Sequence, residues 1–283
     1  MSTRNLLAAL SLLAAGMLLP TSRAAADRGL ELPASVEPGQ LVIAHAPRGT
    51  RLEFDGRILR VGDDGLFVFG IGRDATGEAT LRVTGADGVR RDMRIPVAPR
   101  EYTIERVNGL PQKTVTPDPE TAARIQREQA AVAATRRRDD PREDFLAGFE
   151  RPVTGARISG VYGSQRIDNG VPKAPHMGLD MAVPAGTPIH APAAGIVTFA
   201  ATDLVLTGGT VLIDHGFGLT SSFLHMSRVD VKVGDRISQG QVIGAAGMTG
   251  RATGPHVHWG FNWFGVRLDP ALLPAPQGRT PVH

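Results

Sequence analysis

The stretch Gly254-Pro255-His256-Val257-His258-Trp259-Gly260-Phe261 carries most of the information about this 283-residue chain. If it forms a β-strand, His256 and His258 point to the same face, because strand side chains alternate with a period of two. One imidazole can then bind a metal ion while the other moves protons. Upstream, His176-Met177-Gly178-Leu179-Asp180 offers another histidine and a carboxylate. Catalytic zinc typically takes three such ligands and one water, so the sequence predicts one zinc ion held by His176, Asp180 and His258.

The sequence around these segments, from residue 149 to 275, is typical of β structure and is dense in glycine and proline. Four runs read as strands, at 194–199, 210–214, 220–225 and 241–244. Asn169-Gly170 predicts a turn ahead of the first metal segment. We therefore expect a C-terminal antiparallel β-sheet domain over 149–275, with a short tail at 276–283.

The first half of the chain predicts a second β domain, over residues 27–100. Short apolar runs at 41–43, 52–54, 66–69, 79–83 and 93–97 alternate with turn signals. Three of these signals are Asp-Gly pairs, which suit tight hairpins. The pattern favours a small β-sandwich-like domain, so the whole chain is predicted to be mainly β. The region carries no cluster of metal-binding residues, and His45 is read as an ordinary histidine.

Between the two β domains, residues 101–148 predict a linker that contains one helix. After Pro119, a run of helix formers begins with Glu120 and ends in the triplet Arg136-Arg137-Arg138, which matches the charge preferences of helix ends. The apolar positions are mostly alanine, which indicates an exposed or weakly packed helix. The triplet reads as a solvated helix end, with contact to an acidic partner as the alternative.

The N-terminus has the features of a secretory signal at residues 1–26. Arg4 precedes an apolar run from Leu6 to Leu19, and three alanines at 24–26 are suited to cleavage. The run is short for a membrane span, so no stable membrane insertion is expected after cleavage, although retention as an uncleaved anchor stays open. Export across the inner membrane, to the periplasm, follows as the expected location.

Composition narrows the function further. The chain has no cysteine, so an exported form has no disulfides and cannot be a lipoprotein. Its formal charge of +3 includes Arg4 and Arg23, so the chain without residues 1–26 carries about +1. This balance gives no support to nucleic-acid binding.

Residues 159–261 closely resemble the lysostaphin/LytM-type zinc metalloendopeptidases, which cleave peptidoglycan cross-bridges. The resemblance is carried by Ser159-Gly160-Val161-Tyr162-Gly163, Pro175-His176-Met177-Gly178-Leu179-Asp180, Asp214-His215-Gly216-Phe217-Gly218, Phe223-Leu224-His225-Met226-Ser227 and Gly250-Arg251-Ala252-Thr253-Gly254-Pro255-His256-Val257-His258. It covers a little over a third of the chain and all of the candidate chemistry.

The resemblance implies zinc ligands at His176, Asp180 and His258 and unligated catalytic histidines at His225 and His256. It also implies a peptidoglycan substrate. Which of the two histidines is the general base, and which cross-link is cut, stay open. Phe223 stands where family members often have tyrosine, so a hydroxyl contact is absent there. Neither this departure nor Tyr162, in place of the more usual phenylalanine, touches a ligand.

Two other classes of function compete with the hydrolase. Some family members have lost ligands and act as non-catalytic activators or peptidoglycan-binding modules, but this chain keeps all five residues. A lipoyl- or biotinyl-type carrier is suggested by residues 234–244, but the lysines at 113, 173 and 232 do not stand in a suitable turn. The role of the N-terminal domain, autoinhibition, a regulatory protein partner and the oligomeric state are left open.

Overall fold

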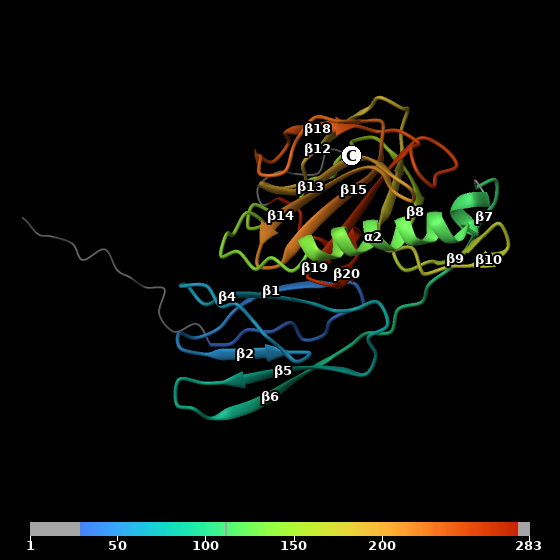
Figure 1. The fold of residues 1–283 in the computed structure, drawn as a ribbon. Helices are drawn as coiled ribbons and strands as arrows, with labels where there is room; N and C mark the ends of the chain where they lie inside the picture. The colour runs from blue at the N-terminus through green and yellow to red at the C-terminus, as the bar shows by residue number, and fades with distance from the viewer. Residues whose placement is uncertain (1–28, 111, 277–283) are drawn as a thin grey trace, which may run out of the picture.

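The computed structural model describes residues 29–110 and 112–276, and its architecture is mainly β, as the sequence predicts. An N-terminal set of strands and a larger C-terminal set lie against each other, and one long helix runs along the C-terminal set (Figure 1). The predicted signal segment lies outside the described residues, as does all of the predicted tail except residue 276. None of the helices in the described part of the chain has the length and apolar character needed to cross a membrane.

The N-terminal strands form two small sheets that pack as a sandwich. Strands β1 (Leu41–His45) and β4 (Leu66–Gly70) form one sheet, and β3 (Arg57–Ile58), β2 (Arg51–Phe54), β5 (Glu78–Thr84) and β6 (Arg90–Pro96) form the other. The predicted Asp55-Gly56 turn joins β2 to β3, with φ of 48° and 73° at its two residues. Positive φ at both positions is what a type I′ hairpin requires, and Asp and Gly tolerate it.

The segment between the two β sets contains more structure than the sequence predicts. Strand β7 (Ile104–Val107) pairs in parallel with β9 (Gln165–Asp168), which forms a hairpin with β10 (Val171–Pro172) through the predicted Asn169-Gly170 turn. A short helix α1 (Gln112–Val115) follows β7. The predicted long helix is α2 (Pro119–Thr135), capped by Asp118, whose carboxylate accepts the Thr121 N–H at 2.8 Å.

The C-terminal set is built on an eight-stranded antiparallel sheet. Its order is β17 (Arg236–Ile237), β13 (Gly195–Leu204), β14 (Gly208–Gly216), β15 (Leu219–Met226), β19 (His256–Trp263), β11 (Leu179–Ala182) and β8 (Arg157–Gly160), with β20 (Val266–Leu268) also on β19. A smaller sheet of β12 (Pro188–His190), β18 (Val242–Ala245) and β16 (Arg228–Val229) accompanies it, and a 3-10 turn at Pro270–Leu272 follows. All four predicted strand runs are confirmed.

Strand β19 shows how the sequence sets the two faces of this sheet. Val257, Trp259, Phe261 and Trp263 alternate along it and are all buried. This side of the strand belongs to the hydrophobic core, which also takes in the N-terminal strands. The residues between them, including both histidines, point to the other face. The alternation therefore separates the core side of the sheet from the side that carries the chemistry.

The two β sets are joined through the end of β19 farthest from its histidines. Phe54 meets Trp263 edge to face, with ring centroids 6.1 Å apart, and the Arg57 guanidinium lies 3.8 Å from the ring centroid of Phe264. Gly70 lies so close that an added Cβ would be 2.8 Å from Leu268. The N-terminal strands are thus packed firmly against the C-terminal sheet at a distance from the candidate site.

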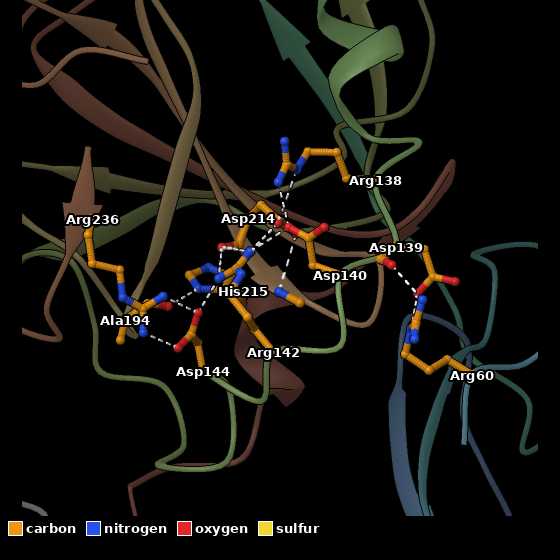
Figure 2. A network of polar contacts seen from close by, with 11 residues as sticks. Arg60, Arg138, Asp139, Asp140, Arg142, Asp144, Ala194, Asp214, His215 and Arg236 are labelled. Carbon is orange, nitrogen blue, oxygen red and sulfur yellow. Dashed lines mark hydrogen bonds and ion pairs between the residues drawn. The ribbon is translucent and has the colours of Figure 1, made fainter. Parts of the chain in front are cut away.

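A network of ion pairs fixes the chain that follows α2 (Figure 2). Arg142 pairs with Asp214, which is 1% exposed at the end of β14, and also with Asp144. Arg236 of β17 holds the same Asp144 at 2.6 Å. The network therefore ties the incoming chain to two strands of the large sheet. Strand β14 continues to Gly216, two residues beyond the end of the predicted run at 210–214.

Candidate metal centre

The three predicted ligands converge on one point of the large sheet. His176 Nε2, Asp180 Oδ1 and His258 Nδ1 are separated pairwise by 3.0, 2.9 and 2.8 Å. Asp180 stands directly opposite His258 in the pairing of β11 with β19, and His176 lies in the loop that leads into β11. Three electron-pair donors so close together repel one another unless a cation lies between them. The donor set therefore fits a metal ion. Among the described residues, this is the one group of three ligand-type side chains whose donor atoms lie close enough together to share an ion.

The groups around the ligands hold them in a metal-binding orientation. The backbone carbonyl of Val161 lies 3.0 Å from His176 Nδ1 and accepts its N–H, which leaves Nε2 free to bind a metal. Arg166 donates to the second carboxylate oxygen of Asp180 at 2.7 Å and lies 3.4 Å from Glu105. His176 and Asp180 thus each present one atom to the cluster while their other polar atom is hydrogen-bonded elsewhere.

Two glycines of the sequence motifs leave space for the ligands. A Cβ at residue 160 would lie 2.5 Å from Asp180 Oδ2, and one at residue 178 would lie 2.5 Å from His258 Nε2. Contacts this short do not occur for real Cβ atoms, so any larger residue would displace a ligand. The glycines at 160 and 178 are therefore required by the geometry of the cluster and not by a turn.

The two remaining predicted site residues, His225 and His256, stand beside the cluster. Their ring centroids are 4.7 Å apart, and His256 Nε2 lies 3.8 Å from Asp180 Oδ1. In each ring Nδ1 donates to a backbone carbonyl at 2.8 Å, from Thr249 for His225 and from Gly254 for His256. Both Nε2 atoms are then free to accept a proton. The structure thus brings together all five residues that the sequence singles out.

The backbone at His225 is strained in a way that suits a functional site. Its φ of 64° lies in the left-handed region, which costs a residue other than glycine about 1–3 kcal/mol. The conformation is held by two contacts: the His225 N–H donates to Thr207 O at 2.8 Å, and its ring donates to Thr249 O. This strained backbone turns the imidazole toward His256.

Burial sets the protonation of the site. It would by itself raise the pKa of the Asp180 carboxyl group, but the polar contacts with His176 and His258 outweigh it and hold that pKa well below its ordinary value. Burial lowers the pKa of His258 to about 4, and burial with the neighbouring His256 and His258 rings lowers that of His225 to about 3. At neutral pH the carboxylate is ionised and these imidazoles are neutral, as metal binding and proton acceptance both require.

The other histidines of the described chain stay away from the cluster. His215 is fully buried, with Nδ1 donating to Ala194 O at 2.6 Å and Nε2 2.8 Å from Ser221 Oγ, which is a structural arrangement (Figure 2). His190 lies near Pro152 O, and His45 faces Asp64 in the N-terminal sandwich. His283 lies outside the described residues.

Sequence reasoning missed the residues that support the cluster from the linker side. Arg166 comes from β9 and Glu105 from β7, two strands that the sequence does not predict. Together with His256 they line a pocket of about 360 Å³ beside Asp180. The sequence shows Arg166 between Gly163 and the Asn169-Gly170 turn. Nothing in its spacing indicates that its side chain faces Asp180.

The fold and the site together define a class of β-sheet proteins with a His-Asp-His cluster suited to a metal ion. Comparisons with known proteins identify the family. Residues 174–270 match the family model for Peptidase family M23. A crystal structure provisionally described as a peptidase M23 from Pseudomonas aeruginosa is 34% identical with a TM-score of 0.63, and the match covers 83% of this chain and 93% of that chain. The chain belongs to peptidase family M23, which confirms the predicted resemblance.

Two relatives with named activities match the C-terminal part. Peptidoglycan DD-endopeptidase ShyC of Vibrio cholerae is 37% identical over 136 residues, which is 47% of this chain and 31% of that protein. DD-carboxypeptidase/endopeptidase Mpg of Neisseria meningitidis serogroup B is 35% identical over 133 residues, or 46% of this chain and 30% of that protein. The chain therefore spans less than a third of the length of these relatives.

Proposed function

We propose that this protein is a zinc-dependent endopeptidase that hydrolyses peptide cross-links of bacterial peptidoglycan. The observation that carries the proposal is the convergence of His176, Asp180 and His258 within 3.0 Å of one another, with two further imidazoles beside them. The named activities of the relatives from Vibrio and Neisseria support the substrate class. The same substrate places the protein's action outside the cytoplasm, in the periplasm if residues 1–26 direct export.

His176, Asp180 and His258 would hold the zinc ion, which when bound would lower the pKa of a bound water and polarise the scissile carbonyl. His225 and His256 then transfer protons and stabilise the developing negative charge. The His225 ring donates through Nδ1 to Thr249 O, which leaves Nε2 free to accept a proton from the attacking water. His256, nearer the carboxylate ligand, can stabilise the oxyanion or protonate the leaving amine. If His225 and His256 take each other's roles, the products of hydrolysis are the same.

The proposal includes a particular type of cross-link. The direct bond between D-alanine and diaminopimelate suits a periplasmic setting better than a glycine bridge does, and the DD-endopeptidase name of the Vibrio relative agrees. Purified sacculi should release muropeptides whose masses correspond to hydrolysis at this bond. A chelator should stop the release, and added zinc should restore it.

Histidine variants test the roles of the two unligated rings. His225→Ala and His256→Ala should each lower the rate of cleavage by about 100-fold or more, because general acid–base catalysis contributes about 10²–10⁴-fold. His45→Ala, which removes a histidine from the N-terminal sandwich, is the matched control. If both site variants cleave sacculi at the wild-type rate, the catalytic roles of His225 and His256, and the mechanism built on them, are wrong. If the wild-type protein binds zinc without cleaving, the non-catalytic activator is the better reading.

A further inference from the structure

A second pocket, of about 360 Å³, lies between helix α2 and the face of the large sheet that carries the histidines. Figure 1 shows the helix lying along this sheet. The helix contributes Ile125 and Val132 to the pocket, and the end of β13 and the turn after it contribute Leu204 and Leu206. The walls are therefore mostly apolar and belong to both elements.

Polar contacts hold the helix in place over the sheet. Arg124 donates to the Asp203 carboxylate at 3.1 Å, and the Val205 N–H donates to Glu128 at 2.9 Å. Glu128 also accepts from Arg124 at 2.7 Å, so both of its carboxylate oxygens are engaged. The helix therefore forms a fixed wall of the pocket. Glu128, the acidic residue in the lining, already accepts hydrogen bonds at both carboxylate oxygens.

Two arginines, Arg136 buried and Arg267 half-buried, line this pocket without a counter-charge. Arg136, directly after the last turn of α2, is 9% exposed, and its Nε has no hydrogen-bond partner. Arg267 of β20 donates to the side-chain oxygen of Asn262 at 3.3 Å. Within residues 29–110 and 112–276 neither guanidinium forms an ion pair. Burial lowers the pKa of both, and for Arg136 the positive charge of Arg267 adds to the effect. The first arginine of the triplet is therefore buried, contrary to the solvated helix end that the sequence favours.

An unpaired buried charge is costly, and buried guanidinium groups normally meet a carboxylate or phosphate. Replacing such a pair of like charges by apolar residues would lower the free energy of the folded chain unless an anion binds there. The planar guanidinium also matches a carboxylate in bidentate geometry. The pocket therefore has the chemistry of an anion site with apolar walls.

The position of the pocket connects it to the metal centre. Leu224 lines the pocket and pairs directly with His258, and Ser222, also in its lining, pairs with Gly260. Paired residues share a face, and two residues along a strand span about 7 Å. The pocket is thus the next stretch of the same sheet face, one step along the strands from the metal ligand.

We infer that this pocket is a subsite in which Arg136 and Arg267 bind a carboxylate of the substrate, with α2 as its wall. The inference rests on the proposed function, since it names the part of the substrate that lies beyond the cleaved bond. The ligand class is a short peptide that carries a free carboxylate next to small apolar side chains. Peptide stems that end in D-alanine have this chemistry.

The test measures binding to the full-length protein in the presence of a chelator, which removes metal coordination and catalysis. The probes are an N-acetylated tetrapeptide stem with a free C-terminal D-alanine and the same peptide as its C-terminal amide, titrated by calorimetry. The acid should bind about tenfold more tightly than the amide, because only the acid offers the guanidinium groups a charged acceptor. Equal binding of the two probes would overturn the subsite.

Variants then assign the preference to the two arginines. Arg136→Gln and Arg267→Gln should each lose most of the preference for the acid, whereas Arg137→Gln, an exposed neighbour with the same change in charge, should keep it. The two subsite variants should also melt at the wild-type temperature or above, because each removes an unpaired buried charge. A clear fall in melting temperature in both would indicate a structural role and would overturn the inference.

The outcomes separate the subsite from the proposed function. If sacculi are cleaved while the acid and the amide bind equally, the subsite is wrong and the hydrolase stands. If the acid is preferred while sacculi stay intact, the subsite stands as a binding site and the hydrolase is wrong. The comparison of the two peptides on the wild-type chain needs no variant, so it decides the matter even if a substitution prevents folding.

Discussion

Replacing Arg166 by methionine should weaken zinc binding without changing any ligand. Its guanidinium donates to the free carboxylate oxygen of Asp180 at 2.7 Å, and its side chain is 24% exposed. Loss of such a supporting contact typically lowers metal affinity by about 10–100-fold, which is about 1.4–2.8 kcal/mol. The positive charge of Arg166 also repels a dication, and its removal acts in the opposite direction. Glu105, 3.4 Å away, neutralises much of that charge, so the loss of orientation should dominate.

The assay is competition with a chromophoric zinc chelator at fixed pH and ionic strength. Arg157→Met is the matched control. Arg157 lines the same pocket beside Asp180 but is exposed, and its replacement removes the same charge. The zinc dissociation constant should rise about 10-fold or more for Arg166→Met and by less than about twofold for the control. Equal dissociation constants for wild type and Arg166→Met would refute the positioning role. Tighter binding would show that charge repulsion outweighs orientation.

Asp180→Asn removes the anionic donor, so dialysed protein should hold clearly less than one zinc per chain by metal analysis, and a full equivalent would contradict the ligand set. Arg142→Met leaves the buried Asp214 carboxylate without its nearest cation, and urea titrations should show a loss of about 3–5 kcal/mol in the free energy of unfolding. Arg138→Met, at a side chain 45% exposed, should cost at most about 1 kcal/mol, and an equal loss in both would count against the network. Burial lowers the pKa of His215 from 6.5 to about 4, so the unfolded chain binds more protons between these values. The stability from this residue is complete above pH 6.5 and is lost as the pH falls toward 4; His215→Gln should flatten that part of the profile, and an unchanged slope would exclude the assignment.

The strands and the ligand cluster could be predicted because their signals are local. Alternating apolar residues and Asp-Gly or Asn-Gly turns indicate the backbone conformation of a few neighbouring positions. The observed bounds of β2, β5, β14 and β15 lie close to those that this pattern predicts. The three proposed ligands stand in short motifs with specific residue patterns. Only their meeting point, set by the pairing of β11 with β19, needed the structure.

The parts that could not be predicted depend on long-range pairing. Strand β7 pairs in parallel with β9, about sixty residues further along the chain, and no local pattern records such a partner. The burial of Arg136 likewise follows from where α2 packs, whereas the charge pattern of the isolated helix favours a solvated end. Arg166 contacts Asp180 only because the pairing of these strands brings it there.

The contact between the sandwich and the far end of β19 limits how this protein can be divided into fragments. Trp263, Phe264 and Leu268 are each at most 6% exposed, and all three lie where the N-terminal strands pack. A shortened chain that starts after the linker would present this aromatic surface to water and tend to self-associate. Low turnover by such a fragment would then indicate aggregation and not the loss of an activating N-terminal domain. The exposed aromatic side chains should therefore first be replaced by polar ones.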